Sequence, residues 1–168
     1  MRPQTDAYAV GASVSSGVLA ASSRWVTTRH VRLAALPSAV PWARRILRAT
    51  LRERQLEGLL EAALLLVSEL VTNAVQASAR LALGDPGWLP TIALGLHITD
   101  TSLVTEVWDA CPAVPALLRA DLAGDRGRGL VLVDCLADAW GHRLTDGGKV
   151  VWCKLTVPDG SPAAQGGV

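Results

Sequence analysis

Residues 69–78 read Glu-Leu-Val-Thr-Asn-Ala-Val-Gln-Ala-Ser, and this stretch decides how the chain is expected to fold. The apolar residues in and before it recur at the three- and four-residue spacing of one face of an α-helix. They are Leu60, Ala63, Leu64, Val67, Leu70, Val71 and Ala74. We therefore predict an amphipathic helix whose apolar stripe packs against a sheet.

Two polar side chains of this helix could carry chemistry. Glu69 and Asn73 are four residues apart, so on a helix they point the same way, about one turn from each other. A carboxylate can act as a general base, and a carboxamide oxygen can bind a metal ion. Ala62 and Leu65 share their side of the helix, which predicts that another part of the chain covers some of it. The alternative is that both polar side chains merely lie on a solvated surface.

A second motif, Gly127-Arg128-Gly129-Leu130, opens a stretch whose apolar residues at 130, 133, 136 and 137 have helical spacing. Free backbone N–H groups at a helix start bind phosphate, and glycine lets the phosphate approach the backbone closely. Arg128 would add positive charge. Alternatively, the glycines only cap a helix or turn the chain. A full dinucleotide fingerprint is absent, because Leu132 takes the place of its third glycine and no strand immediately precedes the turn.

Between these motifs, the residues Val104-Thr105-Glu106-Val107-Trp108-Asp109 are typical of a β-strand that ends at an acidic side chain. An ionised carboxylate accepts hydrogen bonds but donates none. Asp109 could therefore accept a hydrogen bond from an exocyclic amine, which would select adenine over guanine. The alternative is an ordinary aspartate that turns the chain as it leaves the strand.

In this order and spacing, the three motifs resemble those of the GHKL superfamily, which includes gyrase-type ATPases, histidine kinases and anti-sigma-factor serine kinases. The resemblance covers roughly residues 29–157 and is closest to the small bacterial anti-sigma-factor kinases, which carry a single ATP-binding domain. Residues 69–74 correspond to the family's N box, Trp108 and Asp109 to its first glycine box, and residues 127–130 to its second. The ending at residues 147–152 resembles its closing strand.

The resemblance implies a role for each motif residue: a general base at Glu69, a Mg²⁺ ligand at Asn73, an adenine contact at Asp109, and phosphate binding at Gly127, Arg128 and Gly129. The implied activity is an ATP-dependent protein serine/threonine kinase with ATP and Mg²⁺ as cofactors. Its implied partners are a small antagonist protein, which carries the phosphorylated serine, and a sigma factor, which the chain would sequester. Homodimers are common among such relatives.

The chain departs from the family pattern in two places. Ala110, Cys111 and Pro112 follow Asp109 where the family usually has glycines, so the backbone near the adenine has less freedom. Val150 is taken to stand where the closing strand commonly carries a threonine that reaches the adenine pocket through water. Both departures predict weaker nucleotide affinity. They support an alternative function, namely a non-catalytic regulatory module with a weakened or vestigial ATP pocket. A third and more distant hypothesis is a Rossmann-type NAD-binding enzyme.

Composition argues against several other classes of protein. The 168 residues suit one domain with a substantial core, and 16 basic against 15 acidic residues produce no field that would favour nucleic acid. Cys111, Cys135 and Cys153 fit neither a disulfide framework nor a zinc site, which indicates a reducing compartment. Glu61 and Glu69 interrupt the most apolar helix, so no membrane span is expected. We therefore expect a soluble cytoplasmic protein that binds neither nucleic acid nor membrane.

The expected fold is an α/β two-layer sandwich of the Bergerat type, with helices stacked on one face of a mixed, mostly antiparallel sheet. A single ATP-binding domain is predicted over residues 25–157, between a disordered lead at 1–24 and a flexible tail at 158–168. The predicted elements are a strand at 27–33, a helix at 39–55 capped by Ser38, a hairpin of strands at 92–98 and 103–109, a mobile lid over ATP at 110–126, and closing strands at 140–144 and 149–157.

Overall fold

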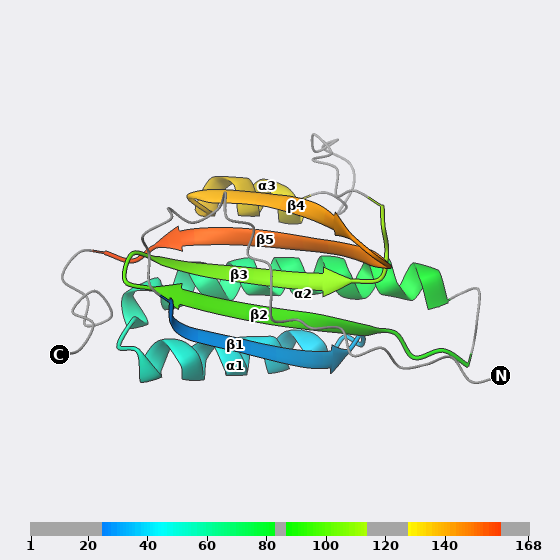
Figure 1. The fold of residues 1–168 in the computed structure, drawn as a ribbon, viewed down its shortest axis with the longest axis horizontal. Coiled ribbons are helices and arrows are strands. Elements are labelled where there is room, and N and C mark those ends of the chain that lie inside the picture. The colour runs from blue at the N-terminus through cyan, green and yellow to red at the C-terminus, as the bar shows by residue number, and fades with distance from the viewer. Residues whose placement is uncertain (1–24, 83–86, 114–127, 159–168) are drawn as a thin grey trace.

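The computed structural model describes residues 25–82, 87–113 and 128–158, which form a five-stranded sheet with helices on one of its faces (Figure 1). The strands are β1 (Trp25–Ala34), β2 (Thr91–Thr99), β3 (Ser102–Asp109), β4 (Ala139–Thr145) and β5 (Gly148–Thr156). The helices are α1 (Ala39–Glu53), α2 (Leu60–Ala82) and α3 (Arg128–Leu136), with a short 3₁₀ turn, η1 (Glu57–Leu59), between the first two. The predicted two-layer sandwich is confirmed.

The strand order is β1-β2-β3-β5-β4, and each strand runs antiparallel to its neighbours. Within the described part of the chain the sheet is thus fully antiparallel rather than mixed. Tight hairpins join β2 to β3 and β4 to β5, which requires antiparallel pairing. Two helices separate β1 from β2, whereas a parallel pair is usually joined by a crossover with one helix. The predicted lead at 1–24 and most of the predicted lid and tail lie outside the described residues.

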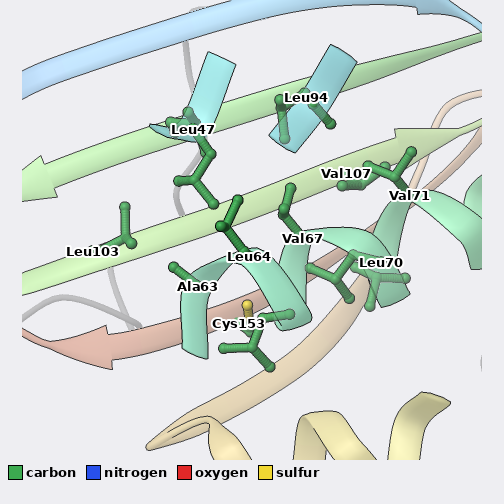
Figure 2. Close-up of a cluster of buried hydrophobic side chains, with 14 of the residues drawn as sticks. Leu47, Ala63, Leu64, Val67, Leu70, Val71, Leu94, Leu103, Val107 and Cys153 are labelled. Carbon is green, nitrogen blue, oxygen red and sulfur yellow. The ribbon is translucent and has the colours of Figure 1, made fainter. Parts of the chain in front are cut away.

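The core lies between the sheet and the helices, and α2 is its central element (Figure 2). The predicted stripe of α2 faces the sheet, and all its members are buried except Leu60, which is partly buried. Alternate side chains of β2 point into the same core, namely Ile92, Leu94, Leu96 and Ile98. Leu47 and Leu51 of α1, which packs against α2, also belong to this core. Helical spacing on α2 and strand alternation on β2 thus meet as the sequence predicts.

The side of α2 away from the sheet is only partly covered. Ala62 packs against the core and the start of α3 lies against Glu69, whereas Leu65 is 41% exposed, so the prediction that part of this side is covered is confirmed. By length and composition alone, the stretch Glu57–Ala82 could cross a membrane. The central helix of a folded core passes the same test, and the buried stripe of α2 accounts for its apolar composition.

Helix α1 begins and ends differently from the usual pattern. Ser38 occupies the N-cap position, but it has helical backbone angles and its side chain makes no capping hydrogen bond. At the other end Gln55 has a φ of 55°, in the left-handed region. The N–H of Leu56 donates to the carbonyl of Leu51 at 2.9 Å, and the N–H of Gln55 donates to the carbonyl of Arg52 at 3.1 Å. These two bonds form a Schellman motif, in which glycine is the preferred residue at the position of Gln55.

The substitution Gln55→Gly is expected to raise the free energy of unfolding by up to about 1 kcal/mol, because it relieves a left-handed conformation that disfavours residues with a Cβ. Urea unfolding followed by circular dichroism measures the change. As a matched control, Gln76→Gly at an exposed position inside α2 is expected to lower the same quantity by about 1 kcal/mol. A similar loss in both variants would contradict the left-handed turn.

Candidate functional site

The start of α3 packs directly against Glu69 and Asn73, the two polar residues singled out on α2. A Cβ atom added at Gly129 would overlap the Oε2 atom of Glu69 and would lie 3.7 Å from the Nδ2 atom of Asn73. Both side chains are half-buried. Two motifs that are far apart in the sequence therefore meet, as predicted, and only glycine fits at their contact without displacing the Glu69 carboxylate.

Apolar packing holds α3 in this position. Val133 is fully buried and belongs to the same core as α2, and Leu130 is also buried. Both lie on the apolar side that the spacing at 130 and 133 predicted. The helix is thereby fixed with its first turn toward Glu69, and the polar contact does not have to hold it there alone.

The first turn of α3 is suited to bind an anion. The first four N–H groups of a helix have no partner inside the helix, and the helix dipole places partial positive charge at this end. Arg128 is the first residue of α3, but its side chain is outside the described part of the structure, as is Gly127. Their predicted phosphate contacts therefore stay predictions, and Gly129 is the member of this motif that the structure places.

Asp109 lies at the end of β3, where it is 1% exposed and faces the helix layer, like Val107 two residues before it. Its Oδ1 atom accepts a hydrogen bond from the N–H of Cys111 at 2.9 Å and another from Nζ of Lys149 at 2.8 Å. Its Oδ2 atom is buried and has no hydrogen-bond partner among the described residues. Burial raises the pKa of Asp109, while the bonds from Lys149 and Cys111 act in the opposite direction.

Lys149, which the sequence reasoning did not single out, is the neighbour of Asp109 on β5. The register pairs Asp109 with Lys149 and Trp108 with Val150. Since successive side chains of a strand point to opposite faces, Val150 lies on the face away from the helices. The prediction that Val150 takes the place of a threonine that reaches the adenine pocket is therefore wrong, because Lys149 is the residue of β5 that shares a face with Asp109. Its Nζ atom also donates to the carbonyl of Cys111 at 2.8 Å.

A close approach of two strands creates this pairing. A Cβ atom at Gly148 would overlap the carbonyl oxygen of Asp109 and would lie 2.9 Å from Cα of Ala110. These are backbone atoms, so no side chain at position 148 can be accommodated by a small shift. Gly147 has a φ of 83° and completes the two-residue turn between β4 and β5. The Gly147-Gly148 pair thus sets the register that brings Lys149 to Asp109.

The polar residues of α2 and the end of β3 lie at the same end of the core. Helix α2 packs against β3, and Figure 2 shows Val71 and Val107 together in the shared cluster. The two elements run in the same direction in Figure 1. Asn73 and Asp109 each follow that packed pair by two residues, so both motifs continue toward one edge of the two-layer sandwich.

Comparison with known protein families matches residues 33–155 to the histidine kinase-like ATPase domain. This range contains α1, α2, α3, the Asp109 strand end and nearly all of β5. No curated protein gives a significant match. The matched range covers well over half of the chain and includes each motif described above. The chain therefore belongs to the histidine kinase-like ATPase domain family of the GHKL superfamily.

Proposed function

We propose that this ATP-binding regulatory protein is a protein serine/threonine kinase that holds Mg-ATP between α2, the start of α3 and the edge formed by β3 and β5. Family membership supports ATP binding and ATP-dependent phosphoryl transfer in general. The observation that supports the finer proposal is the contact of Gly129 with Glu69 and Asn73, because a carboxylate and an amide then lie beside a helix start, and helix starts bind anions in general.

The residues present fit the phosphate and metal end of this ligand. Among the described residues no cluster of three or more His, Cys, Asp or Glu could hold a metal ion. Mg²⁺ does not need such a cluster, since it is usually bound by one or two protein ligands together with substrate phosphates and water. Asn73 would supply the protein ligand through its amide oxygen. The ion, when bound, neutralises charge on the phosphate oxygens.

The base end fits adenine through the free oxygen of Asp109. A buried acceptor without a partner costs about 1–3 kcal/mol, so a ligand that donates a hydrogen bond to Oδ2 recovers that loss. The exocyclic amine of adenine is such a donor. Asp109 would therefore orient the base, while Gly129, with Gly127 and Arg128, would bind the phosphates.

Glu69 would accept the proton of the attacking hydroxyl, which belongs to a serine or threonine of a partner or to water. Resemblance to the anti-sigma-factor kinases supports an antagonist protein as the phosphate acceptor and a sigma factor as a second partner. A homodimer in the cytoplasm is the assembly that this proposal expects.

The alternative proposal is a non-catalytic module that acts by partner binding with a weakened ATP pocket. The bonds around Lys149 favour it. Lys149 already donates one hydrogen bond to Oδ1 of Asp109 and another to the carbonyl of Cys111. The second bond restrains a segment in which the family usually has glycines. Kinetics of the Glu69 variant separate the two proposals.

The substitution Glu69→Gln is expected to lower phosphate release from Mg-ATP by about 10²–10⁴-fold, because an amide cannot accept the proton. Affinity for Mg-ATP should change little, since the shape of the side chain is kept. Radiolabelled phosphate release with water as the acceptor measures the rate, and calorimetry measures binding. Glu61→Gln, exposed on the same helix, is the matched control. Equal rates in parent and variant would remove Glu69 from the mechanism, and a parent that binds without turnover would support the module.

The substitution Gly129→Ala is expected to lower turnover by about tenfold or more while leaving stability nearly unchanged. The new methyl group meets the end of the Glu69 side chain, which can rotate away. The fold is therefore kept, but the carboxylate moves. Turnover and urea unfolding are measured together. Gly58→Ala is the control, because a Cβ atom there meets nothing within 4 Å. Unchanged turnover in Gly129→Ala would contradict the proposed placement of the base.

A further inference from the structure

We propose that Lys149 is a base-reading residue that widens the site from adenine to both purines. This inference rests on the proposed nucleotide site and adds a second group to its base-recognition end. It is carried by the hydrogen-bonding capacity that remains on Asp109 and Lys149 after their contacts with the protein are counted.

Lys149 is 5% exposed and is held in a fixed position. Its ammonium group has three N–H donors. One donates to Oδ1 of Asp109 and one to the carbonyl of Cys111, each at 2.8 Å. The third has no acceptor in the described ranges 25–82, 87–113 and 128–158. One donor therefore remains for a ligand.

Asp109 retains a complementary acceptor, to which no described residue donates a hydrogen bond. Its Oδ1 atom accepts two hydrogen bonds, from Lys149 and from the N–H of Cys111, while Oδ2 accepts none from the described residues. Asp109 and Lys149 lie directly opposite each other on adjacent strands, on the face of the sheet toward the helices. The acceptor and the donor that remain thus belong to two side chains joined by one ion pair of 2.8 Å.

An ion pair that served stability alone would be expected to have its remaining hydrogen-bonding positions satisfied. Burying two charges costs several kcal/mol per ion, and the pair recovers this only when the other lone pairs and protons find partners. Among the residues that the structure describes, neither Oδ2 of Asp109 nor the third proton of Lys149 has such a partner. The unsatisfied atoms point to a ligand that bonds to both residues.

The edge of either purine matches this pair. Adenine presents an amine donor beside the N1 acceptor, so the amine would donate to Oδ2 of Asp109 and Lys149 would donate to N1. Guanine presents an O6 acceptor beside an N1–H donor, so N1–H would donate to Oδ2 and Lys149 would donate to O6. A carboxylate alone repels O6 and rejects guanine. The ammonium of Lys149 removes the basis for that rejection.

The experiment measures dissociation constants of Mg-ATP and Mg-GTP by calorimetry for the full chain and for two lysine variants. The parent is expected to bind the two nucleotides within about tenfold of each other. Lys149→Thr should weaken Mg-GTP binding at least about tenfold more than Mg-ATP binding, because O6 then faces Asp109 without a donor. Lys154→Thr makes the same change on the same strand, on the opposite face, and should leave the ratio unchanged.

The outcomes separate this inference from the proposed function. A parent that binds Mg-ATP but not Mg-GTP overturns the role of Lys149 and leaves the ATP site intact. A parent that binds neither nucleotide overturns the proposed function itself. The comparison of parent affinities needs no variant, so it holds even if Lys149→Thr fails to fold. If that variant folds with an unchanged ratio, Lys149 does not read the base.

Discussion

The contact between Gly129, in the first turn of α3, and the Glu69 and Asn73 side chains of α2 is the constraint on which the site depends. It requires a residue without a side chain at position 129, because a Cβ atom would overlap the Glu69 carboxylate. It also requires that α3 be held by its own apolar side, which Val133 supplies within the core. The same glycine permits the close helix packing and belongs to the helix start at which the proposed function places the phosphates.

The proposed base-recognition end depends on a second close approach, between Gly148 and the backbone at Asp109. That approach fixes the register of β3 and β5 and determines that Lys149 lies opposite Asp109. The two ends of the site are joined through α2 and β3, which share the centre of the core. A change in that core would therefore move the proposed phosphate end relative to the proposed base end without altering a residue of either.

Much of this arrangement could be predicted from the sequence, since the apolar stripe of α2 and the alternation in β2 are periodic and local. The meeting of Glu69 with Gly129 was implied by the resemblance of the motifs to those of the GHKL superfamily. The neighbour of Asp109 could not be predicted in the same way, because register is a long-range property and an error of one residue turns every side chain to the other face. An error of this kind assigned to Val150 the position beside Asp109 that Lys149 takes in the structure.

The most direct test of the central claim is a crystal structure of the chain with Mg²⁺ and a non-hydrolysable ATP analogue. The account predicts phosphate oxygens at the first turn of α3 beside Gly129, the metal ion on the amide oxygen of Asn73, and the adenine amine on Oδ2 of Asp109. A nucleotide bound on another face, or one whose base and phosphates do not reach both Asp109 and Gly129, would contradict it.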